Sequence, residues 1–201
     1  MSALSRALTG VQNRQAPSDV FYTPNEVVDM ALNMCSEDIE EEEKTIWYDP
    51  FKGVGAYYDK FPEGQDKDWG EIMLGRDFYN YTPEKWGDEY DKKIICSNPP
   101  YSHLNGVIDR LIKLNPDIIN LTIGALNLTK NRWKRLKDAG YNITALTACS
   151  VKGWFGQTMI WQFEKNPVKI YKKIRGEFVE VDRSIDFKLN KKRGTHDYIY
   201  E

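Results

Sequence analysis

The sequence contains little of what builds a disulfide framework or a metal site. Its 201 residues include three cysteines, Cys35, Cys96 and Cys149, which are widely spaced and form no CxxC pair. An odd number of cysteines at such spacing argues against a disulfide framework and against a zinc site. A reducing compartment is the default for a chain of this kind. We therefore expect no metal centre.

Long apolar runs are missing as well. No segment approaches the roughly 20 apolar residues that a membrane-spanning helix requires. The N-terminal stretch MSALSRALTG lacks the apolar core of a signal peptide. We expect no membrane segment and an intracellular protein.

The sequence also has no large excess of positive or negative charge. The formal net charge is −2, which argues against a protein that binds nucleic acid through basic charge over its whole surface. The charges are unevenly placed, because residues 37–43 form an acidic block and residues 130–137 and 188–194 are basic. Runs of charge are usually solvated faces, but the two basic segments also permit a local phosphate-binding surface.

The spacing of apolar residues indicates one α/β domain. Hydrophobic residues make up 41% of the chain, and a chain of this length can bury a core. A helix is predicted where Thr23 can act as N-cap, Pro24 takes the first helical position and Glu26 completes a capping box. β-rich runs and helical segments then alternate, which favours a parallel sheet with right-handed crossovers. The expected strands are residues 45–50, 68–74, 92–97, 117–124, 142–151 and 158–165, and the further helices are residues 102–115 and 128–140.

The domain is expected to span residues 1–165, with residues 1–20 loosely held. Residues 166–201 form a basic C-terminal extension. Within it, KIYKKIRGEFVEV predicts a hairpin with its turn near Arg175 and Gly176, followed by a tail.

Three unusual segments follow predicted strands: DPFKGVG at 49–55, EIMLGRD at 71–77 and NPPY at 98–101. In parallel sheets, ligands bind at the carboxyl ends of the strands. The glycines of the first segment let the backbone approach a ligand closely. They do not form GxGxxG, because position 58 is Tyr, and no GK[ST] follows, so neither a nicotinamide cofactor nor ATP is favoured.

Acidic residues at the end of the second predicted strand add to this pattern. Glu71 comes about twenty residues after the glycine turn, where an acid in a doubly wound fold accepts hydrogen bonds from a ribose. Asp77 precedes Phe78, and such a pair can meet the amine and the ring of an adenine. The other interpretation of Asp77 is a turn residue.

Taken in order, FYTP, DPFKGVG, GRDF and NPPY resemble the motifs of the amino-methyltransferases that use S-adenosylmethionine. The resemblance is closest to the DNA adenine-N6 methyltransferases of small viral or phage type and covers residues 20–165. It implies a Rossmann-like class I methyltransferase fold: a mostly parallel seven-stranded sheet with one antiparallel strand and helices on both faces. It also implies a location in the cytoplasm of a bacterial host or of a virus-infected cell.

The resemblance assigns roles residue by residue. The implied activity is that of a site-specific adenine DNA-methyltransferase, with S-adenosylmethionine as cofactor and a flipped-out or single-stranded adenine as acceptor. The implied catalytic residues are Asn98, Pro99, Pro100 and Tyr101. The implied cofactor-binding residues are Tyr22, Thr23, Pro24, Asp49, Pro50, Gly53, Gly55, Glu71, Asp77 and Phe78.

The NPPY motif suits the chemistry of a planar amine. The N6 amine of adenine is a poor nucleophile because its lone pair is delocalised into the ring. The Asn98 side-chain oxygen and the Pro99 carbonyl can both accept hydrogen bonds from this amine and aim its lone pair at the methyl group. The prolines hold the carbonyl still, which is preorganisation, and Tyr101 can stack on the base. Because the transfer is a direct displacement, it needs no evident general base, and the two histidines, His103 and His196, are expected to be bystanders.

The sequence also departs from the family pattern. Lys52 and Val54 replace residues that are commonly small or polar in the cofactor loop, which puts the cofactor affinity in doubt. Only residues 166–201 follow the last predicted strand, so we expect base recognition to fall to short loops, the basic tail, a second copy or a partner subunit. The candidate nucleic-acid contacts are Lys130, Arg132, Lys134, Arg135, Lys152, Trp154, Lys191, Lys192 and Arg193. Phosphate contacts of this kind position a nucleic acid without specifying its sequence.

Two alternatives stay open. NPPY also occurs in enzymes that methylate RNA adenine or a protein glutamine amide, whereas enzymes acting on cytosine N4 more often have Ser in place of Asn98. A rival of another class is a non-catalytic nucleic-acid-binding or regulatory subunit that retains the fold.

Overall fold

The computed structural model describes residues 22–36, 39–40, 42–151, 154, 157–165, 170–174 and 177–181. A six-stranded sheet with the strand order β2-β1-β3-β4-β6-β5 forms the centre of this part of the chain. The strand β6 runs antiparallel to both of its neighbours, and β2, β1, β3 and β4 are mutually parallel. The strands are β1 (Thr45–Asp49), β2 (Asp66–Trp69), β3 (Lys92–Ser97), β4 (Ile118–Gly124), β5 (Tyr141–Cys149) and β6 (Thr158–Lys165).

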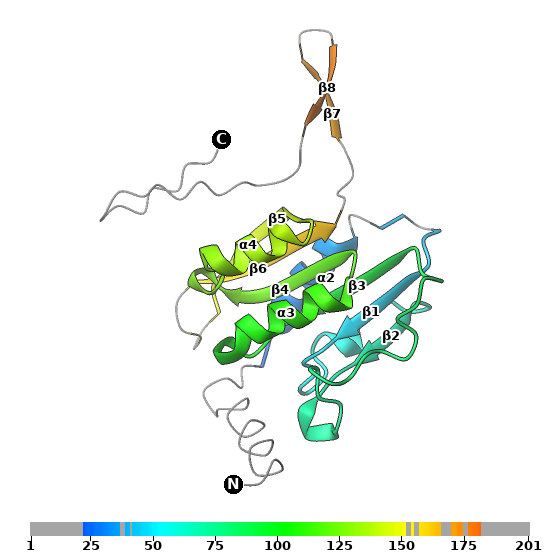
Figure 1. Ribbon diagram of the computed structural model, residues 1–201, viewed down its shortest axis with the longest axis vertical. Helices are drawn as coiled ribbons and strands as arrows, with labels where there is room; N and C mark the ends of the chain where they lie inside the picture. The colour runs from blue at the N-terminus through cyan, green and yellow to red at the C-terminus, as the bar shows by residue number, and fades with distance from the viewer. Residues whose placement is uncertain are drawn as a thin grey trace, which may run out of the picture.

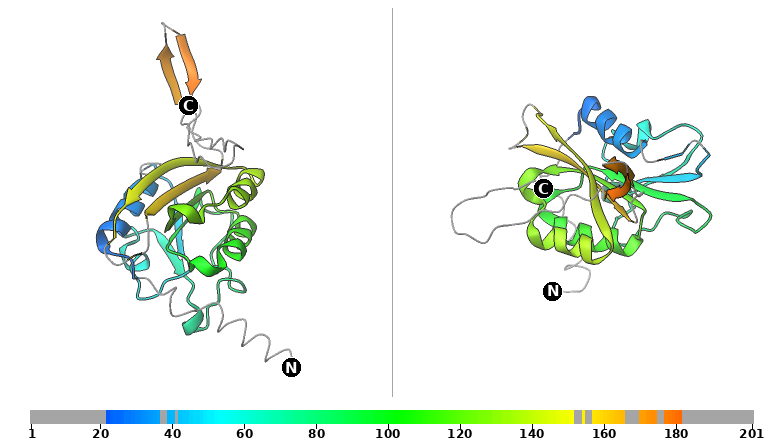
Figure 2. Two further views of the ribbon diagram at one scale, coloured as in Figure 1. Left: turned by 90° about the vertical axis from the view of Figure 1, so that its left-hand side faces the viewer. Right: turned by 90° about the horizontal axis from the view of Figure 1, so that it is seen from above.

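Helices cover both faces of the sheet. Figures 1 and 2 show α2 on one face and α3 with α4 on the other, so the domain has three layers. The helices are α2 (Asn25–Ser36), α3 (Leu104–Leu114) and α4 (Lys130–Asp138). Short 3₁₀ turns follow several strands: η2 (Tyr58–Lys60), η3 (Ile72–Leu74), η4 (Tyr101–His103) and η5 (Ala125–Asn127).

Alternation along the central strands divides the core in two. In β1, Trp47 packs in the cluster under α2, whereas Tyr48 packs in the cluster under α3 and α4. The same division separates Ile94 from Ile95 in β3. Because side chains alternate across a strand, a strand buried on both faces is apolar at nearly every position. This explains why the continuous runs of the sequence predicted these strands well.

The predicted fold class is confirmed, but the predicted number of strands is wrong. The described part of the chain forms a sheet of six strands instead of seven, and β2 lies at its edge. The segment between β2 and β3 is a loop whose side chains bond to the acids of β2. Tyr81 donates to Asp68 over 2.7 Å, and Lys85 and Tyr90 donate to Asp66 over 2.8 and 2.6 Å. These side-chain hydrogen bonds therefore hold the loop against β2 at the edge of the sheet.

The second predicted strand also has different bounds. We expected residues 68–74, whereas β2 ends at Trp69 and residues 72–74 form η3. After β2 the backbone of Gly70 lies close to the segment after β1, because a Cβ there would lie 2.8 Å from both the Pro50 carbonyl oxygen and the Tyr48 hydroxyl. Gly75, with φ of 82°, then ends η3.

Two further predictions concern the ends of the domain. The backbone amides of Val27 and Val28 donate to the carbonyl of Pro24, so Pro24 instead of Thr23 holds the cap position of α2. The predicted hairpin is present as β7 (Ile170–Ile174) paired antiparallel with β8 (Glu177–Val181). No helix within the described ranges is long and apolar enough to cross a membrane.

The close approach at Gly70 gives a stability prediction. In Gly70→Ala, the added methyl group meets backbone and a buried hydroxyl, so we expect a loss of about 1–3 kcal/mol in the free energy of unfolding. Gly124→Ala is the control, because its φ of −59° suits any residue and its added Cβ would meet mainly the movable Asn127 side-chain amide, at 3.0 Å. This control should change the free energy of unfolding by about 1 kcal/mol or less. Urea unfolding measures both, and equal losses would contradict the proposed crowding.

Candidate active site at the carboxyl edge of the sheet

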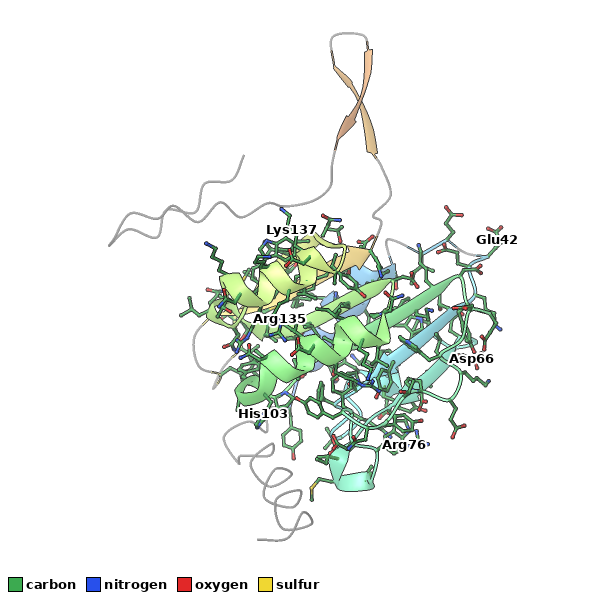
Figure 3. The ribbon with its side chains drawn as sticks, viewed as in Figure 1. Glu42, Asp66, Arg76, His103, Arg135 and Lys137 are labelled. Atoms are coloured by element: carbon green, nitrogen blue, oxygen red, sulfur yellow. The ribbon has the colours of Figure 1, made fainter. Side chains whose placement is uncertain are left out.

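The three segments singled out in the sequence meet at one edge of the sheet. They follow β1, β2 and β3, which are adjacent and parallel, so their carboxyl ends lie side by side. Figure 3 shows Arg76 and His103 at this edge, whereas Glu42 lies at the opposite end of the strands. The chain thus concentrates its unusual loops where parallel sheets bind ligands.

The loop after β1 depends on its two glycines. Gly53 and Gly55 have φ of 51° and 97°, a region that side chains with a Cβ rarely adopt. A Cβ on Gly55 would also lie 2.5 Å from the Asp59 carboxylate. The loop is therefore a tight turn in which Gly53 is exposed and Gly55 is buried against Asp59.

A buried carboxylate marks the start of this loop. Asp49 ends β1 and has no exposed surface. Its Oδ1 accepts a hydrogen bond from Ser97 Oγ over 2.6 Å and from the Phe51 amide over 3.2 Å. Its Oδ2 is buried and has no hydrogen-bond partner among the described residues. Burial raises the pKa of Asp49 from 3.8 to about 7, against the lowering effect of the Ser97 hydrogen bond. A cationic ligand at Oδ2 would offset this cost.

A second carboxylate joins the glycine loop to β2. Glu71 Oε2 accepts a hydrogen bond from the Gly53 amide over 2.9 Å. Its Oε1 accepts one from the Met73 amide over 3.1 Å. The predicted ribose-binding acid is thus held between two loops, at the edge where the ligand site was expected.

Asp77 and Phe78 have structural contacts. Asp77 Oδ1 accepts from the Tyr79 amide and Oδ2 from Asn80 Nδ2, both over 3.2 Å. Phe78 is 2% exposed, and its ring centroid lies 4.9 Å from that of Phe51. Asp77 therefore makes the hydrogen bonds of a turn residue and Phe78 lies in the core beneath the loop after β1, and their role in binding an adenine stays a prediction.

The NPPY segment meets the N-terminal motif. The strand β3 ends at Ser97, and the next residue, Asn98, donates from Nδ2 to Thr23 Oγ1 over 3.2 Å. These two residues are 75 positions apart in the sequence. Pro99 is buried, and Pro100 is extended with φ of −64° and ψ of 125° before Tyr101 opens η4. The prolines therefore fix the backbone that follows Asn98.

Sequence reasoning missed three site residues. Ser97 links Asp49 to the NPPY segment, and its only sequence signal is its position between an apolar run and Asn98. Tyr57 and Thr122 share a buried hydrogen bond of 2.6 Å between their hydroxyls. Tyr57 follows the glycine loop and Thr122 lies in β4, so no local pattern connects them.

The unusual Lys52 in the glycine loop has aromatic neighbours. Its Nζ lies 4.6 Å from the ring centroids of both Tyr58 and Trp69. Arg76 lies 4.2 Å from the Trp69 centroid and forms an ion pair with Asp68 over 2.8 Å. Cations over aromatic rings are attracted by the negative face of the ring. The Lys52 side chain is thus part of an aromatic–cation cluster.

Several predicted nucleic-acid contacts have partners within the domain. Arg132 donates to Asn105 Oδ1 over 2.9 Å and to the Asn127 carbonyl over 2.6 Å. Arg135 forms an ion pair with Asp109 of α3, and Figure 3 shows Arg135 and Lys137 on α4. Through these contacts the two arginines attach α4 to α3 and to η5.

The remaining predicted contacts differ in their setting. Lys134 pairs with Asp138 over 2.5 Å, Lys130 is exposed and Trp154 is half-buried. Four predicted contacts lie outside the described residues: Lys152, Lys191, Lys192 and Arg193. In the part of the chain that the structure describes, no group of three or more His, Cys, Asp or Glu side chains could hold a metal ion.

Comparison with known proteins shows the fold. No protein-family model and no curated protein matches the sequence. A proposed class I S-adenosylmethionine-dependent methyltransferase from Listeria monocytogenes aligns with a TM-score of 0.57 and 12% identity, over 83% of this chain and 68% of that protein. A proposed hemolysin from Lactococcus lactis aligns with a TM-score of 0.50 and 12% identity, over 72% and 89%. A proposed RNA methyltransferase from Pyrococcus horikoshii aligns with a TM-score of 0.49 and 13% identity, over 82% and 99%. The chain has the Rossmann-like fold of class I methyltransferases.

The buried carboxylate gives a pH prediction. The pKa of Asp49 is raised in the folded protein, so its protonated form favours folding. This contribution is complete below the ordinary pKa near 3.8 and is lost as the pH rises through about 7. The loss should be on the order of 4 kcal/mol in the free energy of unfolding and absent from Asp49→Asn. Urea unfolding of both proteins between pH 4 and 8 measures it. Parallel pH profiles would show that the carboxylate is not desolvated.

Proposed function

We propose that the protein transfers a methyl group from S-adenosylmethionine to a planar amine, with the N6 amine of adenine in DNA as the leading acceptor. The observation that carries the proposal is the meeting of Asn98 with Thr23 at the end of β3, beside Asp49 and the glycine loop. The two halves of the resemblance, the cofactor motifs and NPPY, therefore share one edge of the sheet. We choose adenine in DNA as the leading acceptor because the NPPY segment resembles that of the DNA adenine-N6 methyltransferases.

The residues present fit S-adenosylmethionine. Asp49 Oδ2 is a buried anionic acceptor without a partner among the described residues, which suits a cationic ligand. Gly53 is exposed in the loop after β1, and Glu71 lies beside it, where it could meet the ribose hydroxyls. Tyr22, Thr23, Pro24 and Pro50 complete the proposed cofactor set. When bound, the cofactor supplies a methyl group on a positively charged sulfur.

The chain itself positions the acceptor amine. The Asn98 side-chain oxygen and the Pro99 carbonyl accept hydrogen bonds from the amine and aim its lone pair at the methyl group. Pro99 and Pro100 hold these acceptors in place, so little reorganisation is needed during the reaction. Tyr101 stacks on a flipped base. The transfer would form no covalent intermediate with the protein: a bond between the nitrogen and the methyl carbon would replace the bond between sulfur and that carbon, and the amine would lose one proton to water.

A second acceptor, a protein side-chain amide, is favoured by the surface of the same edge. Five large apolar side chains are exposed there or just before α2, namely Tyr22 (64%), Val54 (68%), Met73 (74%), Leu74 (60%) and Leu126 (85%). Exposed apolar groups are typical of protein contacts, whereas DNA binding relies on cations that face phosphates. Arg132 and Arg135 are held by contacts within the domain. A partner subunit or a second copy could use the same apolar side chains.

Methyl incorporation tests the proposal and separates the acceptors. Radiolabelled S-adenosylmethionine is offered with unmethylated single-stranded DNA, duplex DNA, RNA and a mixture of proteins. We expect label in DNA adenine, and a fall of roughly 100-fold or more in Asn98→Ala, because a preorganised acceptor is lost. Asn33→Ala, an exposed change on α2, is the matched control and should keep the wild-type rate. Label only in protein would establish the second acceptor, and label in none would overturn the proposal.

Cofactor binding gives an independent test. A cationic ligand pairs with the ionised form of Asp49, whose pKa is raised to about 7. We therefore expect the affinity for S-adenosylmethionine to rise between pH 6 and pH 8 in the wild type and to change less in Asp49→Asn. Calorimetry at several pH values measures this. No binding at any pH would favour the rival of another class, a non-catalytic subunit with this fold.

A further inference from the structure

The aromatic–cation cluster around Lys52 extends across the carboxyl end of β2. Cationic groups and aromatic rings alternate in it, and each cation lies 4.2 to 4.9 Å from the centroid of the ring beside it. Arg76 and the Tyr81 hydroxyl both bond to Asp68, over 2.8 and 2.7 Å, which closes one end of the series. In spatial order the members are Lys67, Tyr58, Lys52, Trp69, Arg76 and Tyr81.

Lys52 lies at the centre of this cluster and ties the glycine loop to the end of β2 in two ways. Its Nζ lies 4.6 Å from the ring centroids of both Tyr58 and Trp69. Cations at this distance from a ring face are attracted to it. The backbone amide of Lys52 also donates to the Gly70 carbonyl over 2.9 Å. Side chain and backbone therefore hold the same residue against the end of β2.

The loop beyond Lys52 benefits from such a restraint because of its glycines. Gly53 and Gly55 have positive φ, and glycine loses more conformational freedom on ordering than any other residue. A ligand that had to order this loop would bind more weakly by the free energy of ordering. The Gly53 amide donates to Glu71 Oε2 over 2.9 Å, so an ordered loop also fixes the proposed ribose-binding acid. A restraint on Lys52, the residue before Gly53, acts before any ligand arrives.

We propose that Lys52, held between Tyr58 and Trp69, is a positioning residue that keeps the glycine loop ordered for S-adenosylmethionine. This inference rests on the proposed function and reverses the expectation from the sequence, in which Lys52 put the cofactor affinity in doubt. A small residue at position 52 would keep the backbone bond to Gly70 but would lose both ring contacts. The affinity for the cofactor therefore depends on a side chain that lies outside the family pattern.

The direction of the effect separates this role from a simple effect of charge. S-adenosylmethionine carries a positively charged sulfur, so a lysine that acted through its charge alone would repel it. Removing that charge would then tighten the binding of S-adenosylmethionine and leave unchanged the binding of S-adenosylhomocysteine, whose sulfur is uncharged. Loss of a restraint on the loop weakens both ligands to the same extent, because the loop must be ordered for either.

The test is Lys52→Met, which removes the cation and keeps an unbranched side chain. We expect the Kd for both ligands to rise about tenfold, because a cation held over aromatic rings contributes on this order. Lys44→Met is the matched control, since the Lys44 Nζ lies 4.5 Å from the Tyr90 centroid and residue 44 precedes β1, at the opposite end of that strand. Calorimetry at pH 8 measures all three proteins. Unchanged or tighter binding of S-adenosylmethionine in Lys52→Met would overturn the proposal, as would an equal rise in Lys44→Met.

Two further variants test whether the rings mediate the effect. Lys52→Arg keeps a cation that stacks on aromatic faces and should restore most of the affinity that Lys52→Met loses. In a Trp69→Leu background one of the two rings is already missing, so Lys52→Met should raise the Kd by clearly less than tenfold. A full tenfold rise in that background would show that Lys52 acts without Trp69 and would contradict the proposal.

Amide exchange in the protein without ligand separates failure of this inference from failure of the proposed function. The amides of Gly53 and Gly55 donate to Glu71 and to the Lys52 carbonyl. We expect both to exchange about tenfold faster in Lys52→Met and at the wild-type rate in Lys44→Met. Equal exchange in the wild type and Lys52→Met would refute the restraint even if the wild type binds its cofactor. If the wild type binds no S-adenosylmethionine, the proposed function fails, and faster exchange in Lys52→Met still establishes the restraint on the loop.

Discussion

The hydrogen bond between Ser97 and Asp49 is the interaction on which the site depends. It joins the ends of β1 and β3 over 2.6 Å and holds a carboxylate that has no exposed surface. Burying a carboxylate is costly, and a fold selected for stability alone would replace it with an apolar residue. The cost becomes understandable when the carboxylate is a ligand for a cation. The same bond sets the glycine loop and the NPPY segment at a fixed separation.

The sequence predicted the central strands because their burial leaves a local signal. The runs that became β3 and β4 are buried at most positions, and most of the buried residues are apolar. The edge of the sheet left no such signal. The loop between β2 and β3 is fixed by side-chain bonds to Asp66 and Asp68 across 13 to 24 positions. Propensity and periodicity describe neighbours within a few residues, which is why the bounds of the second strand were predicted as 68–74 instead of Asp66–Trp69.

The site was predictable to the extent that it sits at strand ends. The sequence alone predicted that Asp49, Glu71 and Asn98 lie close together, because parallel strands align their carboxyl ends. Ser97, Tyr57 and Thr122 could not, because each acts through a partner 48 or 65 positions away. The basic segment 130–137 shows a second limit of sequence reasoning, because its contacts could not be predicted from the run of cations alone. A run of cations looks the same in a sequence whether it faces phosphates or, as with Arg135 and Asp109, a neighbouring helix.

Two features of the carboxyl edge oppose the usual placement of charged residues at the surface and apolar residues in the core. A buried carboxylate lies beneath it, and large apolar side chains are exposed around it. Departures from stability of this kind are expected where a protein has another requirement to meet. Under the proposed function, the buried carboxylate of Asp49 would face the cationic cofactor, whereas the exposed apolar side chains lie on the surface that an acceptor would approach. The two features therefore suit two different molecules at one edge of the sheet, as the transfer of a methyl group between two substrates requires.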